Sequence, residues 1–146
     1  MIARLSDDGH KEIVLGDDKN FNAAVLMVHI IAADGKVTPE EEAKLLSVLE
    51  THYDMSAKDA AKLAEQAKLA QSEAIDLHAF TSVLKKQMSE VERLGLVEDL
   101  WEMVYADGEL HEFEDNLVWR VAELVGISSD RRMALKRLVR DRAIPS

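Results

Sequence analysis

Cysteine is absent from the sequence. This absence excludes disulfide bridges, thiolate metal ligands and cysteine nucleophiles, and it is typical of a protein from a reducing compartment. Only 2 prolines and 6 glycines occur among the 146 residues, which leaves few turn residues for a β-sandwich and favours helices. The longest apolar run, AAVLMV from Ala23, is interrupted at His29. It is therefore far too short to span a bilayer.

A secretory leader is missing as well. The N-terminal segment MIARLSDDGHKEIVLGDD has neither the apolar centre nor the small-residue cleavage site of a signal peptide. The expected location is therefore the cytoplasm.

Positive charge is scarce except near the C-terminus. The formal net charge is −10, but residues 128–146 contain six basic and two acidic side chains and so carry +4. The rest of the chain therefore carries −14, a field that repels nucleic acid and anionic membranes and attracts cations or basic partners. We expect the basic segment to lie as a helix against this acidic body.

Apolar periodicity and capping residues predict seven helices. Their expected spans are about 20–33, Thr38 to about Tyr53, Ser56 to about Gln71, a short helix capped by Asp76, Ser89 to about Ala106, a helix ending at Gly126, and a basic helix from Ser128 or Ser129 to just before Pro145. The first helix should be central, because apolar residues surround its axis. Residues 1–18 are weakly patterned and are expected to form an N-terminal arm, which leaves residues 19–146 as one helical domain.

Some positions within these helices carry more detailed expectations. Gly95 lies inside the fifth expected helix and indicates a kink or a close helix contact there. Phe113 belongs to the expected apolar stripe of the sixth helix. Leu135, Leu138 and Val139 should give the last helix an apolar edge that packs on the bundle.

One acidic motif occurs twice. The stretch AADGKVTPEEE from Ala32 returns 73 residues later as YADGELHEFED from Tyr105, each time between two expected helices. The matched pairs are Asp34 and Asp107, Gly35 and Gly108, Glu41 and Glu114, and Glu42 and Asp115. Two copies of one unit in a chain that is helical throughout predict an all-α fold with a pseudo-twofold repeat of helix-turn-helix units.

Each copy offers an aspartate in the turn and a glutamate in the first turn of the next helix. Hard cations prefer such oxygen donors, and calcium takes about six to eight of them. The sequence argues against an EF-hand. The first and third positions of such a loop would be Ile30 and Ala32 in one copy, and Met103 and Tyr105 in the other. None of these ligates through its side chain. A metal would need both copies, backbone carbonyls or water, and we expect at least two of the carboxylates to lie within mutual reach.

The same acids also have a purely structural interpretation. Glu41 can reciprocate the Thr38 cap in a capping box, which stabilises a helix by about 1 kcal/mol. Acidic residues in a first turn also suit the helix dipole. His111 replaces Thr38 in the second copy and is a poor N-cap, which weakens this interpretation there. The residues alone leave both interpretations open.

The stretches ADGKVTPEEE and YADGELHEFEDNLVWRVAELVGIS resemble the tellurite-resistance TerB-like proteins, over about residues 20–143. The resemblance implies a small bacterial domain that forms an irregular bundle of about seven helices with a pseudo-twofold. It also implies an acidic cluster that binds a divalent cation of unidentified type. By motif match, the metal-binding residues are Asp34, Glu41, Asp107 and Glu114. Glu42 and Asp115 are further candidates. The resemblance also implies a part in bacterial stress, tellurite and phage responses, protein partners, and membrane-linked complexes at the periphery of the inner membrane.

Three functions are compatible with these observations. The first is a non-enzymatic module that binds a divalent cation and recruits partners, and the second is a structural interaction domain without metal. The third, a metal-dependent hydrolase, is the least supported, because nothing supplies a general base distinct from the ligands. No catalytic motif of the serine-hydrolase, phosphate-loop or zinc-helix type is present. We expect neither a nucleic-acid partner nor a transmembrane segment, and the oligomeric state stays open.

Overall fold

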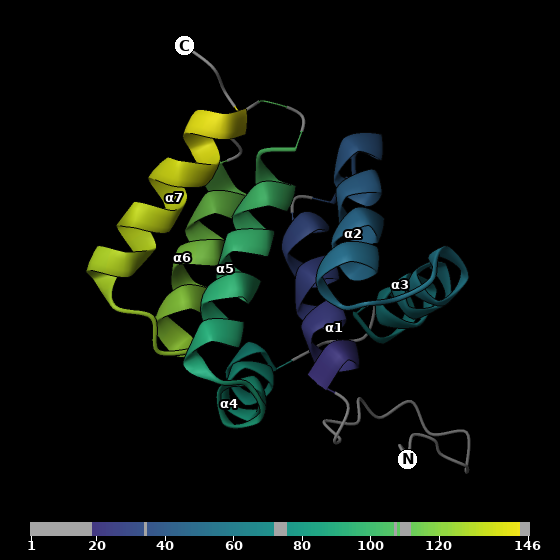
Figure 1. Cartoon of the computed structure of the whole chain (residues 1–146), viewed down its shortest axis with the longest axis horizontal. Helices are drawn as coiled ribbons and strands as arrows, with labels where there is room; N and C mark the ends of the chain where they lie inside the picture. The colour runs from purple at the N-terminus through teal and green to yellow at the C-terminus, as the bar shows by residue number, and fades with distance from the viewer. Residues whose placement is uncertain (1–18, 34, 72–75, 107, 109–111, 144–146) are drawn as a thin grey trace.

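The protein is described by a computed structural model that covers residues 19–33, 35–71, 76–106, 108 and 112–143. These residues form a bundle of helices without any strand (Figure 1), which confirms the predicted all-α fold. The helices are α1 (Lys19–Ile31), α2 (Pro39–His52), α3 (Ala57–Gln71), α4 (Leu77–Gln87), α5 (Glu90–Val104), α6 (Glu112–Leu124) and α7 (Ser129–Ala143). The proposed arm, residues 1–18, lies outside the described residues, so the domain division stays a prediction.

The helices begin where short polar side chains can satisfy free backbone N–H groups. Thr38 and Ser89 each form a capping box, with Glu41 and Glu92 as the reciprocal acids. Asp76 accepts a hydrogen bond from the backbone of Ala79 at 3.1 Å. These caps fix the starts of α2, α4 and α5 at the positions that the sequence predicts.

Helix α1 is the centre of the bundle. Every residue from Asn22 to Val28 is buried, as are Ile30 and Ile31. The helix touches α2, α3, α4, α5 and α6, so most of its surface is covered by other helices. This arrangement explains why its apolar residues surround the axis instead of forming a stripe.

Six of the seven described helices form two three-helix units. In the first unit α3 packs on α1 and α2, and in the second α7 packs on α5 and α6. The units meet through contacts of α1 with α5 and α6 and of α2 with α5, while α4 lies against α1 and α6. The predicted repeat therefore extends from a helix pair to a helix triplet.

Three details differ from the sequence-based expectation. Phe113 is 61% exposed, because the inward face of α6 begins one residue later, at the buried acids Glu114 and Asp115. Leu138 is 50% exposed, because α7 packs along a narrow edge that includes Leu135 and Val139. Gly95 causes neither a kink nor a close contact, because α5 is continuous and a Cβ atom at Gly95 would meet nothing within 4 Å.

Helix α7 packs on the bundle, as predicted. Val139 is buried, and Arg142 forms ion pairs with Glu98 at 3.0 Å and Glu102 at 2.8 Å. Among the described helices, none has the length and the apolar character needed to cross a bilayer.

Candidate functional site

The two acidic turns close with the same backbone hydrogen bonds. The N–H of Gly35 donates to the carbonyl of Ala32 at 3.0 Å, and the N–H of Gly108 donates to that of Tyr105 at 2.9 Å. The bond two residues earlier is also matched, at 3.2 Å in both copies. Both glycines have a positive φ, 86° and 79°, a conformation that glycine adopts without steric cost.

The backbone geometry predicts that replacing glycine by alanine destabilises the protein at Gly35 and Gly108 but stabilises it at Gly95. Gly35→Ala and Gly108→Ala should each lower the free energy of unfolding by about 1 kcal/mol, because a Cβ atom is strained at positive φ. Gly95→Ala is the matched control and should raise it by about 0.5–1 kcal/mol, because the residue lies within a helix with open space around it. Urea unfolding measures all three, and a stabilising effect at Gly35 or Gly108 would contradict the turn geometry.

The glutamates of the motif lie at corresponding buried positions. Glu41 is 1% exposed, and its Oε1 accepts a hydrogen bond from the Thr38 N–H at 3.0 Å. Glu114, in the first turn of α6, is also 1% exposed. Glu41 therefore has the structural role that its spacing from Thr38 indicates, and both carboxylates point into the protein instead of into bulk solvent.

The aspartates of the motif, Asp34 and Asp107, lie outside the described residues, and so does His111. The structure therefore locates two of the four predicted ligands. Helices α1 and α5 both end at the upper end of the bundle in Figure 1, and α2 and α6 both begin there. We call this end the acidic end. Whether the four carboxylates converge stays a prediction.

The next acid of each copy is bound by a lysine from the third helix of its own unit. Glu42 accepts a hydrogen bond from Lys68 of α3 at 2.8 Å. Asp115 accepts one from Lys136 of α7 at 2.9 Å. These two acids, which the sequence offers as additional metal ligands, therefore tie α3 and α7 to their units.

Asp115 is the centre of a buried polar network. Its Oδ1 accepts hydrogen bonds from the Trp101 indole at 3.0 Å and the Tyr105 hydroxyl at 3.3 Å. Burial, followed by the charge of Asp115, raises the pKa of Tyr105 to about 12. Lys136 also lies 5.8 Å from the ring centre of Trp119, so one lysine binds both a carboxylate and an aromatic face.

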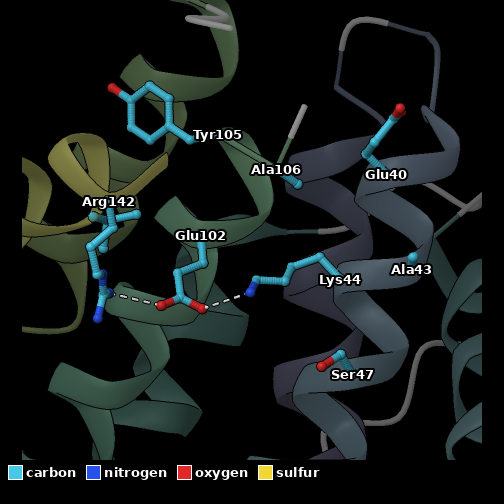
Figure 2. A pocket seen from close by; sticks show the side chains of 9 residues that line it. Glu40, Ala43, Lys44, Ser47, Glu102, Tyr105, Ala106 and Arg142 are labelled. Atoms are coloured by element: carbon cyan, nitrogen blue, oxygen red, sulfur yellow. Dashed lines mark hydrogen bonds and ion pairs between the residues drawn. The ribbon is translucent and has the colours of Figure 1, made fainter. Parts of the chain in front are cut away.

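A cleft of about 630 Å³ opens at the acidic end between α2, α5 and α7 (Figure 2). Glu40, which precedes the buried Glu41, lines one wall, and Tyr105 and Ala106, which precede the second acidic turn, line another. The cleft therefore lies between the two copies of the motif. Residues of both three-helix units line it.

A glutamate between two cations crosses this cleft. Lys44 of α2 lies 3.3 Å from one oxygen of Glu102, and Arg142 of α7 lies 2.8 Å from the other. Figure 2 shows the three side chains in one row along the cleft. Glu102 belongs to α5, so this triad connects α2 of the first unit with α5 and α7 of the second.

A family profile described as "Tellurite resistance protein TerB" matches residues 20–137, which is most of the chain. The chain belongs to the TerB family. The match confirms the resemblance seen in the doubled acidic motif, and it ends within α7. No curated protein and no solved structure matches the chain.

Within this TerB domain, the acids of each motif divide into two groups. The buried glutamates lie at the acidic end, and the acids that follow them hold the third helix of each unit. Among the described residues, no three histidine, aspartate or glutamate side chains form a group that could hold a metal ion. Whether the turn aspartates Asp34 and Asp107 complete such a group stays a prediction.

Sequence reasoning missed one further pair in the TerB domain. The Nδ1 of His52, at the end of α2, lies 2.7 Å from the carboxylate of Asp99 in α5. Burial raises the pKa of Asp99 to about 6, and the neighbouring His52 opposes this effect. No local signal could have revealed the pair, because 47 residues separate its members. The one weak signal in the sequence was that Asp99, a charged residue, lies among the inward-facing residues of α5.

Proposed function

We propose that this TerB protein is a non-catalytic module that binds a divalent cation at its acidic end and recruits protein partners in a bacterial stress response of the tellurite-resistance type. One observation supports the proposal most. Two turns with matched backbone hydrogen bonds end at the same end of the bundle, on either side of one cleft. Two copies of a motif at the same end of the bundle are an arrangement that a shared ligand would need.

The chemistry of the donors fits a hard cation. Glu41 and Glu114 supply carboxylate oxygens that are shielded from bulk water, where an ion is attracted more strongly than at an exposed surface. The capping bond of Glu41 uses one oxygen, and a carboxylate retains further lone pairs for a cation. Asp34 and Asp107 complete the proposed ligand set, and calcium, magnesium and manganese all accept such oxygen donors.

A bound cation would also change the surface that a partner meets. The chain is strongly acidic, with a net charge of −10, and a divalent ion at the acidic end would lower the local negative potential. An ion with open coordination positions can accept an acidic group of a partner. The proposal assigns binding to this site and no chemical reaction.

Thermal melting tests the cation site. We expect calcium, magnesium or manganese to raise the melting temperature saturably, because a ligand that binds only the folded state adds about 1.4 kcal/mol at ten times its Kd. For a chain of this size that corresponds to roughly 4 °C. The double variant Asp107→Asn, Glu114→Gln should lose the response. Glu112→Gln, an exposed acid in the same first turn, is the matched control and should keep it.

The other outcomes distinguish the alternatives. A metal-insensitive wild type, together with a double variant that melts higher, would indicate a repulsive acidic surface suited to a basic partner. A metal-insensitive wild type with a double variant that melts lower would support the structural interpretation, in which the acids serve only the fold. The capping box of Glu41 favours this second candidate function, an interaction domain without metal.

A further inference from the structure

The carboxylate of Asp115 is held at both of its oxygens. Oδ1 accepts hydrogen bonds from the Trp101 indole at 3.0 Å and from the Tyr105 hydroxyl at 3.3 Å. Oδ2 accepts one from the Lys136 ammonium group at 2.9 Å. The residue is 6% exposed, and three of its roughly four acceptor positions are used within the protein. This arrangement favours a positioning role for Asp115 over the role of a metal ligand.

Tyr105 connects this carboxylate to the second acidic turn. It is the C-cap residue of α5, and its backbone carbonyl accepts the hydrogen bond from the Gly108 N–H that closes the turn. Its hydroxyl donates to Asp115, which directly follows the buried Glu114 in the first turn of α6. One residue therefore contacts the end of α5, the turn and the start of α6.

The first copy of the motif lacks the donors of this network. A shift of 73 residues, the spacing of the two copies, places Val28 where the second copy has Trp101. The same shift places Ala32 at the position of Tyr105. Neither Val28 nor Ala32 has a side chain that can donate a hydrogen bond. The two hydrogen bonds from α5 to Asp115 are therefore specific to the second copy.

The two copies fix their glutamates by different means. In the first copy, Thr38 and Glu41 form the capping box that begins α2. In the second copy the sequence has His111 at the position of Thr38, and a capping box needs serine or threonine there. The hydrogen bonds from α5 to Asp115 supply a different constraint on the first turn of α6, and with it on the neighbouring Glu114.

We propose that Tyr105 and Asp115 are positioning residues of the acidic end, which set the separation between the second acidic turn and Glu114 so that both can contact one cation. This inference rests on the proposed function, which supplies the cation. Hydrogen-bond partners that orient metal ligands typically change metal affinity by about 10- to 100-fold. Lys136 balances the charge of Asp115, so Asp115 constrains the turn without adding an unpaired negative charge to the site.

Tyr105→Phe tests the proposal, because it removes the hydroxyl and keeps the ring. Asp115 retains its other two donors in this variant, so the fold should stay intact. The probe is manganese chloride, titrated calorimetrically into the full-length protein. We expect the Kd of the variant to rise by at least about tenfold. The matched control is Tyr53→Phe, which changes the other tyrosine of the chain at the end of α2 and should leave the Kd unchanged.

Amide hydrogen exchange without metal is the second measurement. In Tyr105→Phe the Gly108 amide should exchange about fivefold faster, because the turn loses a constraint equivalent to one hydrogen bond of ordinary strength. The Gly35 amide, which closes the first turn, should keep its rate. This readout separates positioning from a general loss of stability, because a general loss would accelerate exchange at both glycines.

Three results would overturn the proposal. The first is an unchanged Kd in Tyr105→Phe when the wild type binds manganese, a result that leaves the proposed function intact. The second is a lower Kd in this variant, because Asp115 would then act as a ligand once the hydroxyl has released it. The third is an unchanged exchange rate at Gly108, which decides the question even if the wild type binds no manganese and the proposed function fails.

Discussion

Replacing Asp115 by alanine should lower the free energy of unfolding by about 3–5 kcal/mol, the usual effect of removing one partner of a buried ion pair. The side chain of Asp115 is 8% exposed and that of Lys136 is 20% exposed. Without the carboxylate, the Lys136 ammonium group loses its ion-pair partner in a place that is only partly open to water. The indole of Trp101 and the hydroxyl of Tyr105 also lose their shared acceptor, and each unmet donor adds to the loss.

The repeat supplies a matched control for this variant. Glu42→Ala removes the equivalent acid of the first unit, but Glu42 and Lys68 are both about one-third exposed, so the effect should stay below about 1 kcal/mol. In Asp115→Ala the pKa of Tyr105 should also fall from about 12, because the neighbouring negative charge is gone. Urea unfolding and a spectroscopic titration of tyrosine measure the two effects. Equal losses in both variants would show that burial does not set the strength of these pairs.

The second large effect concerns Asp99 and depends on pH. Burial raises the pKa of this carboxyl from 3.8 to about 6, so the folded protein holds the proton more tightly than the unfolded chain does. Its contribution to stability is therefore complete below about pH 4 and is lost as pH rises through about 6. A shift of about 2 pKa units corresponds to about 3 kcal/mol.

Asp99→Asn should remove this dependence. We expect the variant and the wild type to have similar free energies of unfolding near pH 4, and the variant to be more stable by up to about 3 kcal/mol at pH 7. Guanidinium unfolding at several pH values measures the difference. A variant that is less stable at every pH would mean that the bond between Asp99 and His52 outweighs the burial of the charge.

The positions of the helices were predictable because their signals are local. Thr38 and Ser89 lie three residues before a glutamate, and this spacing is sufficient to place a capping box. The turns at Gly35 and Gly108 were predictable for the same reason, since a glycine after an apolar helix marks its end. The family resemblance was equally visible, because it depends on short motifs that are contiguous in the sequence.

The orientation of individual side chains was harder to predict, because it depends on which neighbours cover each helix. The inward face of α6 includes Glu114 and Asp115, and a pattern based on apolar residues assigns that place to Phe113 instead. Asp115 can be buried only because Trp101, Tyr105 and Lys136 converge on it from two other helices. Such long-range partners leave no trace in the local spacing of a sequence.

The sequence motif of the candidate site was predictable, but the three-dimensional arrangement of its residues was predictable only in part. The sequence names four carboxylates, and the structure locates Glu41 and Glu114 at the start of equivalent helices. It could not indicate that Glu102 lies between Lys44 and Arg142 in the intervening cleft, because these residues come from three separate helices. The open space beside Gly95 was likewise not predictable, since a glycine within a helix is compatible with close contact as well as with open space.

The division into two three-helix units also has a consequence for the order of assembly. The two most extensive helix contacts, of α3 with α1 and of α7 with α5, lie within the units, and contacts between near neighbours in sequence form fastest because they close short loops. We therefore expect each unit to nucleate separately, and α1 and α2 to dock against α5 afterwards. The acidic end exists only once that docking is complete, since its two turns belong to different units. A ligand bound there would stabilise the contact between the two units. Its dissociation would therefore weaken the packing between the units before it weakened the packing within either unit.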